Sequence, residues 1–403
     1  MSPHEQCQYQ KSKYHRGSHG VTRIPVNPEL LTWARERAGL DALALAGRFP
    51  KLSEWEAGEL QPTLRQLEDF ARAVHVAVGY LFLPAPPQEP LPIPDFRTLA
   101  DRDISRPSPN LLDTIFLCQQ RQDWFRDYAR LHALPALDFA GSATLQHAPE
   151  WVAEAMRQTL ALSMAERRQC PTWTDALRQL IGKAEDAGVL VMASGVVGSN
   201  SHRKLSVEEF RGFALADDLA PLVFLNGADS KAAQMFTLAH ELAHLWLGES
   251  GISNPEAGRL AEPGVERWCN AVAAEFLMPL ALLRQEYQGG VPVAKEIQRL
   301  ARSFKVSTLV ALRRLFDAGF IDESTLWQHY RDELARIHTL DRGGSGGGDF
   351  YRTLGARTGK RFARAVLSST LEGQTLFQDA FRMLGVRKTS TFYEAARELG
   401  VLL

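Results

Sequence analysis

The chain has 403 residues, enough for two or three domains that each bury a core of their own. Hydrophobic residues make up 45% of the sequence and charged residues 23%, which is typical of a globular protein and excludes a disordered or fibrous one. The formal net charge of −1 excludes a strong overall attraction to nucleic acid or to a membrane surface.

Cysteine usage and the first residues indicate the compartment. The four cysteines, Cys7, Cys118, Cys170 and Cys269, have no paired spacing, so we expect a reduced, cytoplasmic protein and not a disulfide framework. Residues 1–22 are polar and lack the apolar core of a signal peptide, which predicts a disordered tail. No apolar stretch is long enough to span a bilayer, so no membrane partner is expected.

Short amphipathic segments follow over residues 23–84 and predict a bundle of the helix-turn-helix kind. Pro50 interrupts the segment where a groove-entering helix should continue. Residues 23–83 contain seven basic and eight acidic side chains, so this segment lacks the basic footprint of a DNA-binding module. DNA binding, if any, should be weak, and a protein-docking or dimerisation bundle is the alternative.

A proline-rich connector over residues 85–110 should act as a semi-rigid, extended spacer. Residues 111–131 and 151–188 then show helical periodicity. Three short apolar runs, 189–192, 213–216 and 222–225, predict strands. They precede an apolar helix that Asp229 or Ser230 can cap. The edge strand of such a sheet could hold an extended peptide by main-chain pairing.

The apolar helix contains the pattern His-Glu-x-x-His. His240 and His244 are four residues apart, so both imidazoles lie on one helix face and can reach one metal ion. Glu241 is placed to deprotonate a water molecule held there. The alternative is an ordinary core helix whose histidines are only hydrogen-bonded. Because two histidines and an acid are costly to bury among Leu, Ala and Trp, a metal site is favoured.

A second helix, which Pro279 ends, offers a third metal ligand. Glu266 and Glu275 both qualify by chemistry, but they lie on opposite faces, so only one can point at the metal. We favour Glu266 because it shares its face with Asn270, which could orient a ligating histidine. Glu275 is then expected to be a salt-bridged or helix-surface carboxylate.

The remainder of the chain is predicted to be helical. Residues 294–304, 307–318 and 324–338 should support the metal-site domain, which we place at 111–340. A glycine-rich linker occupies 341–348 and a C-terminal helical domain 349–403. This last domain has a cluster of basic residues, for which a solvated helix face is a commoner explanation than contact with nucleic acid or an acidic partner: Arg352, Arg357, Lys360, Arg361 and Arg364.

Several stretches resemble the ImmA/IrrE family of metallopeptidases. They are residues 210–215, 221–226, the His-Glu-x-x-His helix and 274–279, with residues 91–98 and an amino-terminal segment similar to an XRE-type helix-turn-helix. The resemblance implies a gluzincin-like site in which His240, His244 and Glu266 bind one zinc ion per chain and Glu241 is the catalytic base. It also implies a protein substrate, a helix-turn-helix repressor that controls stress-response or mobile-element genes.

We therefore predict a mainly helical α+β protein: a small sheet beside the His-Glu-x-x-His helix, plus an N-terminal bundle. The predicted function is zinc-dependent endopeptidase activity. Two alternatives stay open at this point, a peptidase toxin restrained by a cognate antitoxin and a DNA-binding regulator with a sensory or structural zinc site. A homodimer is one option for its assembly.

Overall fold

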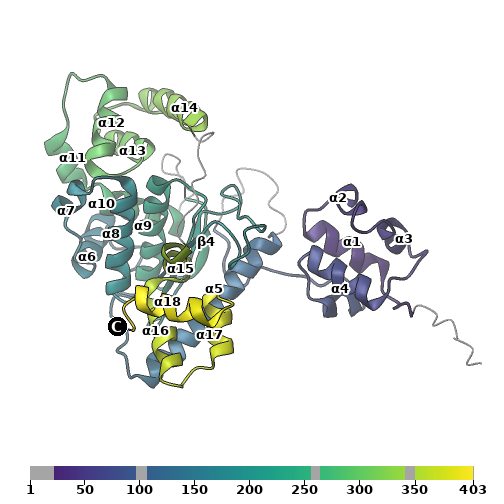
Figure 1. Ribbon diagram of the computed structural model, residues 1–403. Helices are drawn as coiled ribbons and strands as arrows, with labels where there is room; N and C mark the ends of the chain where they lie inside the picture. The colour runs from purple at the N-terminus through teal and green to yellow at the C-terminus, as the bar shows by residue number, and fades with distance from the viewer. Residues whose placement is uncertain (1–21, 97–106, 256–263, 341–349, 403) are drawn as a thin grey trace, which may run out of the picture. The chain divides into compact units, whose positions relative to one another are not determined.

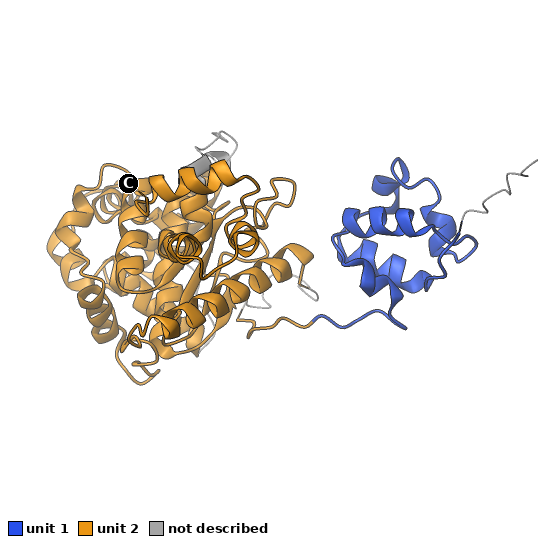
Figure 2. Cartoon of the chain, turned by 60° about the horizontal axis from the view of Figure 1, so that its bottom comes forward, with its two compact units in different colours: residues 1–89 blue, residues 90–403 orange. Residues whose placement is uncertain are grey.

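The computed structural model describes residues 22–96, 107–255, 264–340 and 350–402 (Figure 1). The chain forms two compact units, residues 1–89 and residues 90–403 (Figure 2). The tail predicted at 1–22 (apart from its last residue), residues 97–106 of the connector and the linker at 341–348 lie outside the described residues. The boundaries predicted for these three segments therefore stay predictions.

The first unit is a bundle of short helices: α1 (Pro28–Arg37), α2 (Ala42–Ala46), α3 (Leu52–Glu56), α4 (Leu64–Ala73) and η1 (Val78–Phe82). Leu30, Trp55, Leu67 and Phe70 are almost completely buried in a hydrophobic cluster that contains residues of this unit alone. Pro50 lies in the turn between α2 and α3, as expected of a residue that cannot continue a helix.

The second unit contains a four-stranded sheet in the order β1-β3-β2-β4. The strands are β1 (Leu190–Ser194), β2 (Gly212–Leu215), β3 (Leu222–Asn226) and β4 (Gly251–Ser253). β1 pairs with β3 in parallel, and the other two pairings are antiparallel. The mainly helical α+β class with a small sheet is confirmed. The three predicted strands match β1, β2 and β3 within two residues, whereas β4 was not predicted because three residues carry too little periodicity.

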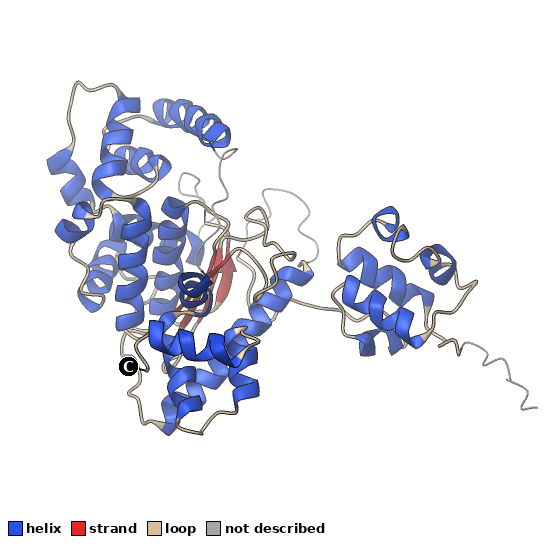
Figure 3. Ribbon diagram, in the orientation of Figure 1, coloured by secondary structure: helices blue, strands red, loops and turns tan. Residues whose placement is uncertain are grey.

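Helices cover both faces of this sheet (Figure 3). Alternate strand residues point to opposite sides. Val191, Ala214 and Val223 join one hydrophobic cluster, and Met192, Phe213 and Phe224 join another. Because both faces are buried, the strands read in the sequence as continuous apolar runs.

The first cluster is built with helices that include the His-Glu-x-x-His helix, α9. They are α6 (Pro149–Thr159), α7 (Met164–Gln169), α8 (Trp173–Asp186), α9 (Lys231–Leu247), α10 (Val265–Leu277), α11 (Leu280–Glu286), α12 (Val293–Phe304), α13 (Thr308–Asp317) and α14 (Glu323–Leu340). The predicted helices at 294–304, 307–318 and 324–338 agree with α12, α13 and α14 within two residues, whereas residues 151–188 form three helices and α11 was not predicted. The chain leaves the helical conformation after α6. Ala161 has a φ of 45°, which a right-handed helix does not allow.

The second cluster is built with α5 (Pro109–Leu131), α15 (Phe350–Thr358), α16 (Lys360–Leu371), α17 (Phe377–Leu384) and α18 (Thr389–Glu398). The segment that we expected as a separate C-terminal domain therefore shares its core with the sheet. Phe362, Val366 and Phe392 are fully buried in that common core. The physical reason is that the second face of the sheet is as apolar as the first and needs its own helical cover.

The connector does not end as a free spacer. The Ile252 amide donates to the Pro94 carbonyl, and the Phe96 amide donates to the Ile252 carbonyl, both at 3.0 Å. Residues 94–96 thus lie along the outer edge of β4, and Asp95 is bridged to Ile252 in parallel. A Cβ at Gly251 would lie 2.2 Å from a carbon of the Phe96 ring, so this position requires glycine.

No helix in the described part of the chain is long and apolar enough to cross a membrane.

Candidate metal centre

α9 is a well-defined helix that brings the two histidines of the motif onto one face. Ser230 caps its start, accepting a hydrogen bond from the Ala233 amide at 3.2 Å, and Gly248 ends it with φ of 73°. Of the two capping residues considered from the sequence, Asp229 pairs with Arg211 instead. His240 and His244 are both fully buried, and their Nε2 atoms lie 3.1 Å apart.

Glu266, in the first turn of α10, completes a group of three donors. Its Oε1 lies 3.0 Å from His244 Nε2 and its Oε2 lies 3.4 Å from His240 Nε2. Zinc bound tetrahedrally at 2.0–2.1 Å separates its ligand atoms by about 3.3 Å. The three donors therefore have the separation and the chemistry that a zinc ion requires. Among the described residues, these three side chains are the ones grouped closely enough to bind a metal ion together.

The protonation states of these side chains also suit a cation. Burial, more than any charge, lowers the pKa of His244 and favours the neutral imidazole that a metal binds. Burial alone would raise the pKa of Glu266, but the charges and hydrogen bonds of His240 and His244 lower it to about 2. His244 thus presents a neutral imidazole and Glu266 an ionised carboxylate.

Asn270 fixes one of the histidines. Its Oδ1 lies 3.0 Å from His240 Nδ1, and because a carbonyl oxygen only accepts, Nδ1 carries the proton and Nε2 has the free lone pair. His244 has no such partner, since its buried Nδ1 makes no hydrogen bond to any described residue. The ring of His244 instead stacks against Phe96, with centroids 5.4 Å apart.

Glu241 is completely buried, and neither carboxylate oxygen accepts a hydrogen bond of ordinary geometry from a described residue. Burial first, and the charge of Glu266 second, raise the pKa of Glu241 well above its usual value, although the Ser253 hydroxyl opposes them. Gly212 of β2 makes room for it. A Cβ there would lie 3.1 Å from Glu241 Oε1 and 2.5 Å from Thr237 Cγ2, so the helix can approach β2 only at a glycine.

Glu275 lies in a different environment. It forms a buried ion pair with Arg314 of α13, and its carboxylate accepts from the Leu280 amide at 3.3 Å. The structure thus brings His240, His244, Glu266 and Asn270 together and places Glu275 elsewhere. The roles assigned to them remain predictions. Cys269, one turn from Glu266, is fully buried, and burial raises the pKa of its thiol well above the usual value, which favours a packing role.

Two neighbours of the centre were missed from the sequence. The Ser253 hydroxyl of β4 lies 3.4 Å from His244 Nε2 and 3.3 Å from Glu266 Oε1. Phe96 comes from the connector. Both residues depend on β4, a strand too short to be recognised, and no local pattern marks either of them. The segment Leu91–Thr98, which carried part of the family resemblance, was the one available signal for Phe96.

Comparison with known proteins places this centre in a recognised domain. Residues 184–316, which contain all the site residues from α9 and α10, match the IrrE N-terminal-like domain family. Residues 358–398 match a domain of unknown function, DUF8813.

Two curated relatives match a shorter stretch of the chain. One is the radiation response metalloprotease IrrE of Deinococcus radiodurans, 32% identical over 99 residues, which are 23% of this chain and 30% of that protein. The other is the radiation response metalloprotease IrrE of Deinococcus deserti, 33% identical over 99 residues, or 23% and 35% of the two chains. The chain thus spans about a third of the length of these relatives. The domain is that of a metalloprotease family, which implies a metal.

Proposed function

We propose that this protein is a zinc-dependent endopeptidase that cuts a protein substrate. The observation that carries the proposal is a buried acid, Glu241, with no ordinary hydrogen-bond partner beside a three-donor set of His240, His244 and Glu266. The match of residues 184–316 to the IrrE N-terminal-like domain supports it.

The donor set favours a catalytic site over a structural one. Structural zinc sites are usually closed by four protein ligands, whereas catalytic sites have three and an open position. Among the described residues, three side chains converge here. The nearby thiol of Cys269 is held in its neutral form by burial, so it is a poor fourth ligand.

Each side chain has a separate task in the proposed chemistry. His240, His244 and Glu266 would hold the zinc, which when bound lowers the pKa of water and polarises a carbonyl group. Glu241 takes the proton from the attacking water and returns it to the departing amine. Asn270 holds His240 in the tautomer that leaves Nε2 free.

For the substrate, we propose a helix-turn-helix repressor that controls stress-response genes. The names of the two relatives refer to a radiation response, which supports a stress setting. The first unit, an XRE-type helix-turn-helix bundle in this proposal, has helices and a core of its own. It could recognise the substrate, because such bundles also dock with proteins.

Two other functions are alternatives. One has the same chemistry with a different biological effect, and the other gives the metal a different role. A peptidase toxin would have the same chemistry with a cognate antitoxin as its partner. A DNA-binding regulator would use the zinc for sensing or structure, and the net charge of −1 over residues 23–83 weighs against it.

Glu241→Gln tests the proposal. The variant should keep its zinc and melt at nearly the wild-type temperature, because Gln has the size of Glu and leaves the three donors unchanged. Cleavage should fall by at least roughly a hundredfold, since the general base is lost. The variant should retain bound substrate, which mass spectrometry of the captured complex would identify.

The control is Glu249→Gln, which removes a carboxylate just beyond the end of α9. If Glu241→Gln preserves the biological activity while zinc removal abolishes it, the zinc is sensory or structural and the peptidase proposal fails. Capture of an antitoxin encoded beside this gene would favour the toxin.

A further inference from the structure

A second cavity lies away from the metal donors. It has a volume of about 1060 Å³ and is walled by α8, α16, α5 and the first turn of α9, and none of the three metal donors lines it. Ligand sites in proteins commonly occupy about 300–1,000 Å³, so a molecule of mononucleotide size can fit. Neither the proposed chemistry nor the substrate accounts for this cavity.

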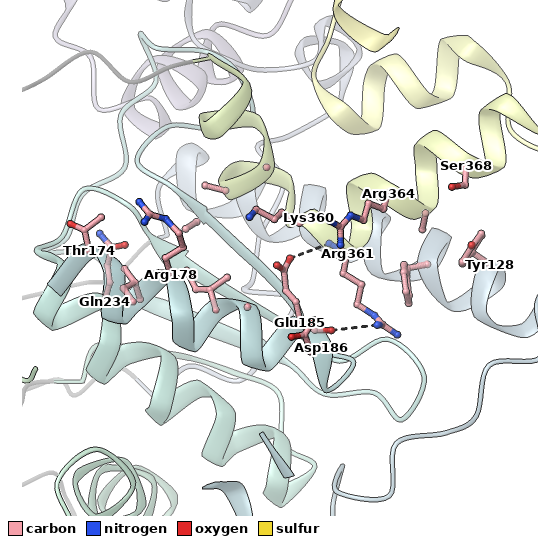
Figure 4. Close-up of a pocket in the computed structure, with 18 of the residues that line it drawn as sticks. Tyr128, Thr174, Arg178, Glu185, Asp186, Gln234, Lys360, Arg361, Arg364 and Ser368 are labelled. Atoms are coloured by element: carbon pink, nitrogen blue, oxygen red, sulfur yellow. Dashed lines mark hydrogen bonds between the residues drawn. The ribbon is translucent and has the colours of Figure 1, made fainter. Parts of the chain in front are cut away.

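The cavity has an apolar floor and a basic rim. Phe125, Leu177 and Ala365 of the floor are buried. Around them stand five basic side chains and two acidic ones, a lining charge of +3: Arg178, Lys231, Lys360, Arg361 and Arg364 against Glu185 and Asp186. Figure 4 shows Lys360, Arg361 and Arg364 projecting from α16 beside Glu185 of α8. This arrangement suits a molecule with an apolar body and an anionic group.

Most of these cations form no close ion pair, although Glu185, Asp186 and Asp229 act on them at longer range. Arg178 is paired with Asp175 at 2.7 Å, but the other four form no ion pair with a carboxylate of the described residues. Lys231 has only the neutral Gln234 as a side-chain partner, at 3.3 Å. Arg364 donates to the Leu399 carbonyl at 2.9 Å. Elsewhere in this unit, partly buried arginines such as Arg126 and Arg203 are paired with aspartates.

Arg361 is the most constrained member of this group. Its guanidinium lies over the Phe125 ring, 5.6 Å from the centroid, and its Nη1 donates to the Glu185 main-chain carbonyl at 3.3 Å. Its Nε is buried without a hydrogen-bond partner, and burial lowers the pKa of the group. A desolvated cation with an unused donor is costly unless an anion compensates it.

We propose that this cavity binds an organic phosphate: an apolar or aromatic body that rests on the floor and carries a phosphate monoester toward the rim. A phosphate monoester carries about −1.5 to −2 charges at neutral pH, which matches the lining charge better than a single carboxylate does. The guanidinium groups offer the planar donor pairs that phosphate oxygens accept. The basic cluster of residues 352–364, for which a solvated face was the commoner explanation, thus supplies three of the four cations that form no close ion pair.

The position of Lys231 gives such a ligand a direct contact with the metal helix. Lys231 is the first residue of α9, which carries His240 and His244 two to four turns later. The binding proposal itself does not depend on proteolysis, and it is tested by binding alone.

Calorimetric titration of the full chain with adenosine 5′-monophosphate, adenosine and inorganic phosphate tests the proposal. We expect saturable binding of the monophosphate with a Kd below about 1 mM, and at least tenfold weaker binding of adenosine and of phosphate. The double variant Lys360→Met, Arg364→Met should weaken monophosphate binding at least tenfold. Both residues are exposed, so the fold should persist.

Two further variants make the result decisive. Arg382→Met removes an exposed arginine of α17 outside the cavity and should leave the Kd unchanged. Ser368→Trp fills one wall of the cavity and should abolish binding without removing a charge. Absence of saturable monophosphate binding, an unchanged Kd in the double variant, or phosphate that binds as tightly as the monophosphate would each overturn the proposal.

Discussion

At the scale of single residues, the metal centre is defined by which carboxylate of α10 faces the histidines. Glu266 and Glu275 are both glutamates of α10, so side-chain chemistry does not distinguish them as ligands. Only the helix face on which each lies does so. The face shared with Asn270 was visible in the sequence, because one turn separates it from Glu266. The partner of Glu275 was not visible, since Arg314 lies 39 residues further along and reaches it only through the packing of α13.

The ligand assignment predicts the zinc content of four variants. His240→Ala, His244→Ala and Glu266→Ala should each lose the one zinc ion per chain, measured by plasma mass spectrometry after dialysis. Glu275→Ala should keep it but unfold at a lower temperature, because the change leaves the buried Arg314 without its closest carboxylate, a loss of about 3 kcal/mol. Zinc loss in Glu275→Ala with Glu266→Ala unaffected would reverse the assignment.

At the scale of the elements, the long apolar helices and the three buried strands could be predicted because their periodicities are strong. What could not be predicted depends on contacts between distant segments. β4 has three residues, and it is held by β2 on one side and residues 94–96 on the other. The four C-terminal helices read as an independent bundle because their apolar faces do not reveal what they cover. Glycines 212 and 251 show the same limit, since each is required by a neighbour remote in sequence.

The pairing of the connector with β4 predicts a gain of activity in Phe96→Ala. Residues 94–96 occupy the edge where an extended substrate would pair in the proposed reaction, and a stacked aromatic pair contributes about 0.5–1.5 kcal/mol. The variant should keep its zinc and cleave its substrate with kcat/KM raised roughly two- to twelvefold. The amide of Ile252 should exchange hydrogen faster.

Phe116→Ala, which removes an exposed aromatic ring of α5, is the control for Phe96→Ala and should change neither quantity. Faster exchange at Ile252 with unchanged cleavage would show that the connector pairs with β4 without obstructing the substrate.

The contact of α8 with α16 predicts a stability that depends on pH. The Arg361 amide donates to Glu185 Oε1 at 3.1 Å, and burial is the largest effect on Glu185, raising its pKa from 4.5 to about 7. The folded protein therefore favours the protonated acid. The stabilisation that protonation provides is complete below pH 4.5 and is lost as the pH rises to about 7.

Glu185→Gln should remove this dependence, because the amide stays neutral and still accepts the hydrogen bond. Relative to wild type, the variant should gain stability between pH 5 and pH 8, with an upper limit of about 3 kcal/mol from 2.5 pKa units. Melting temperatures measured across this range would check it. A difference between the two proteins that does not change with pH would contradict the assigned cause.

At the scale of the whole molecule, two units with separate cores combine a metal-binding domain with a bundle of nearly neutral charge. Residues 23–83 carry a net charge of −1, so contact with DNA would release few counter-ions. The fragment 1–89, which has its own hydrophobic cluster, should bind DNA with a Kd weaker than about 1 μM and a shallow salt dependence. Fluorescence anisotropy with duplexes of several sequences would measure both. Nanomolar affinity for one operator at physiological salt would show that the bundle is a sequence-specific DNA-binding domain.

The pairing of residues 94–96 with β4 also bears on the solubility of shortened proteins. An exposed sheet edge presents unpaired amides and carbonyls that can recruit other chains, and natural proteins cover such edges. Here the cover comes from a segment that sequence analysis places between domains, where a fragment would ordinarily be cut. A fragment that starts after Phe96 would expose the amide and the carbonyl of Ile252 together with the apolar surroundings of Gly251. Fragments of the metal-binding unit should therefore begin at or before Pro90, and those that begin after Phe96 should aggregate.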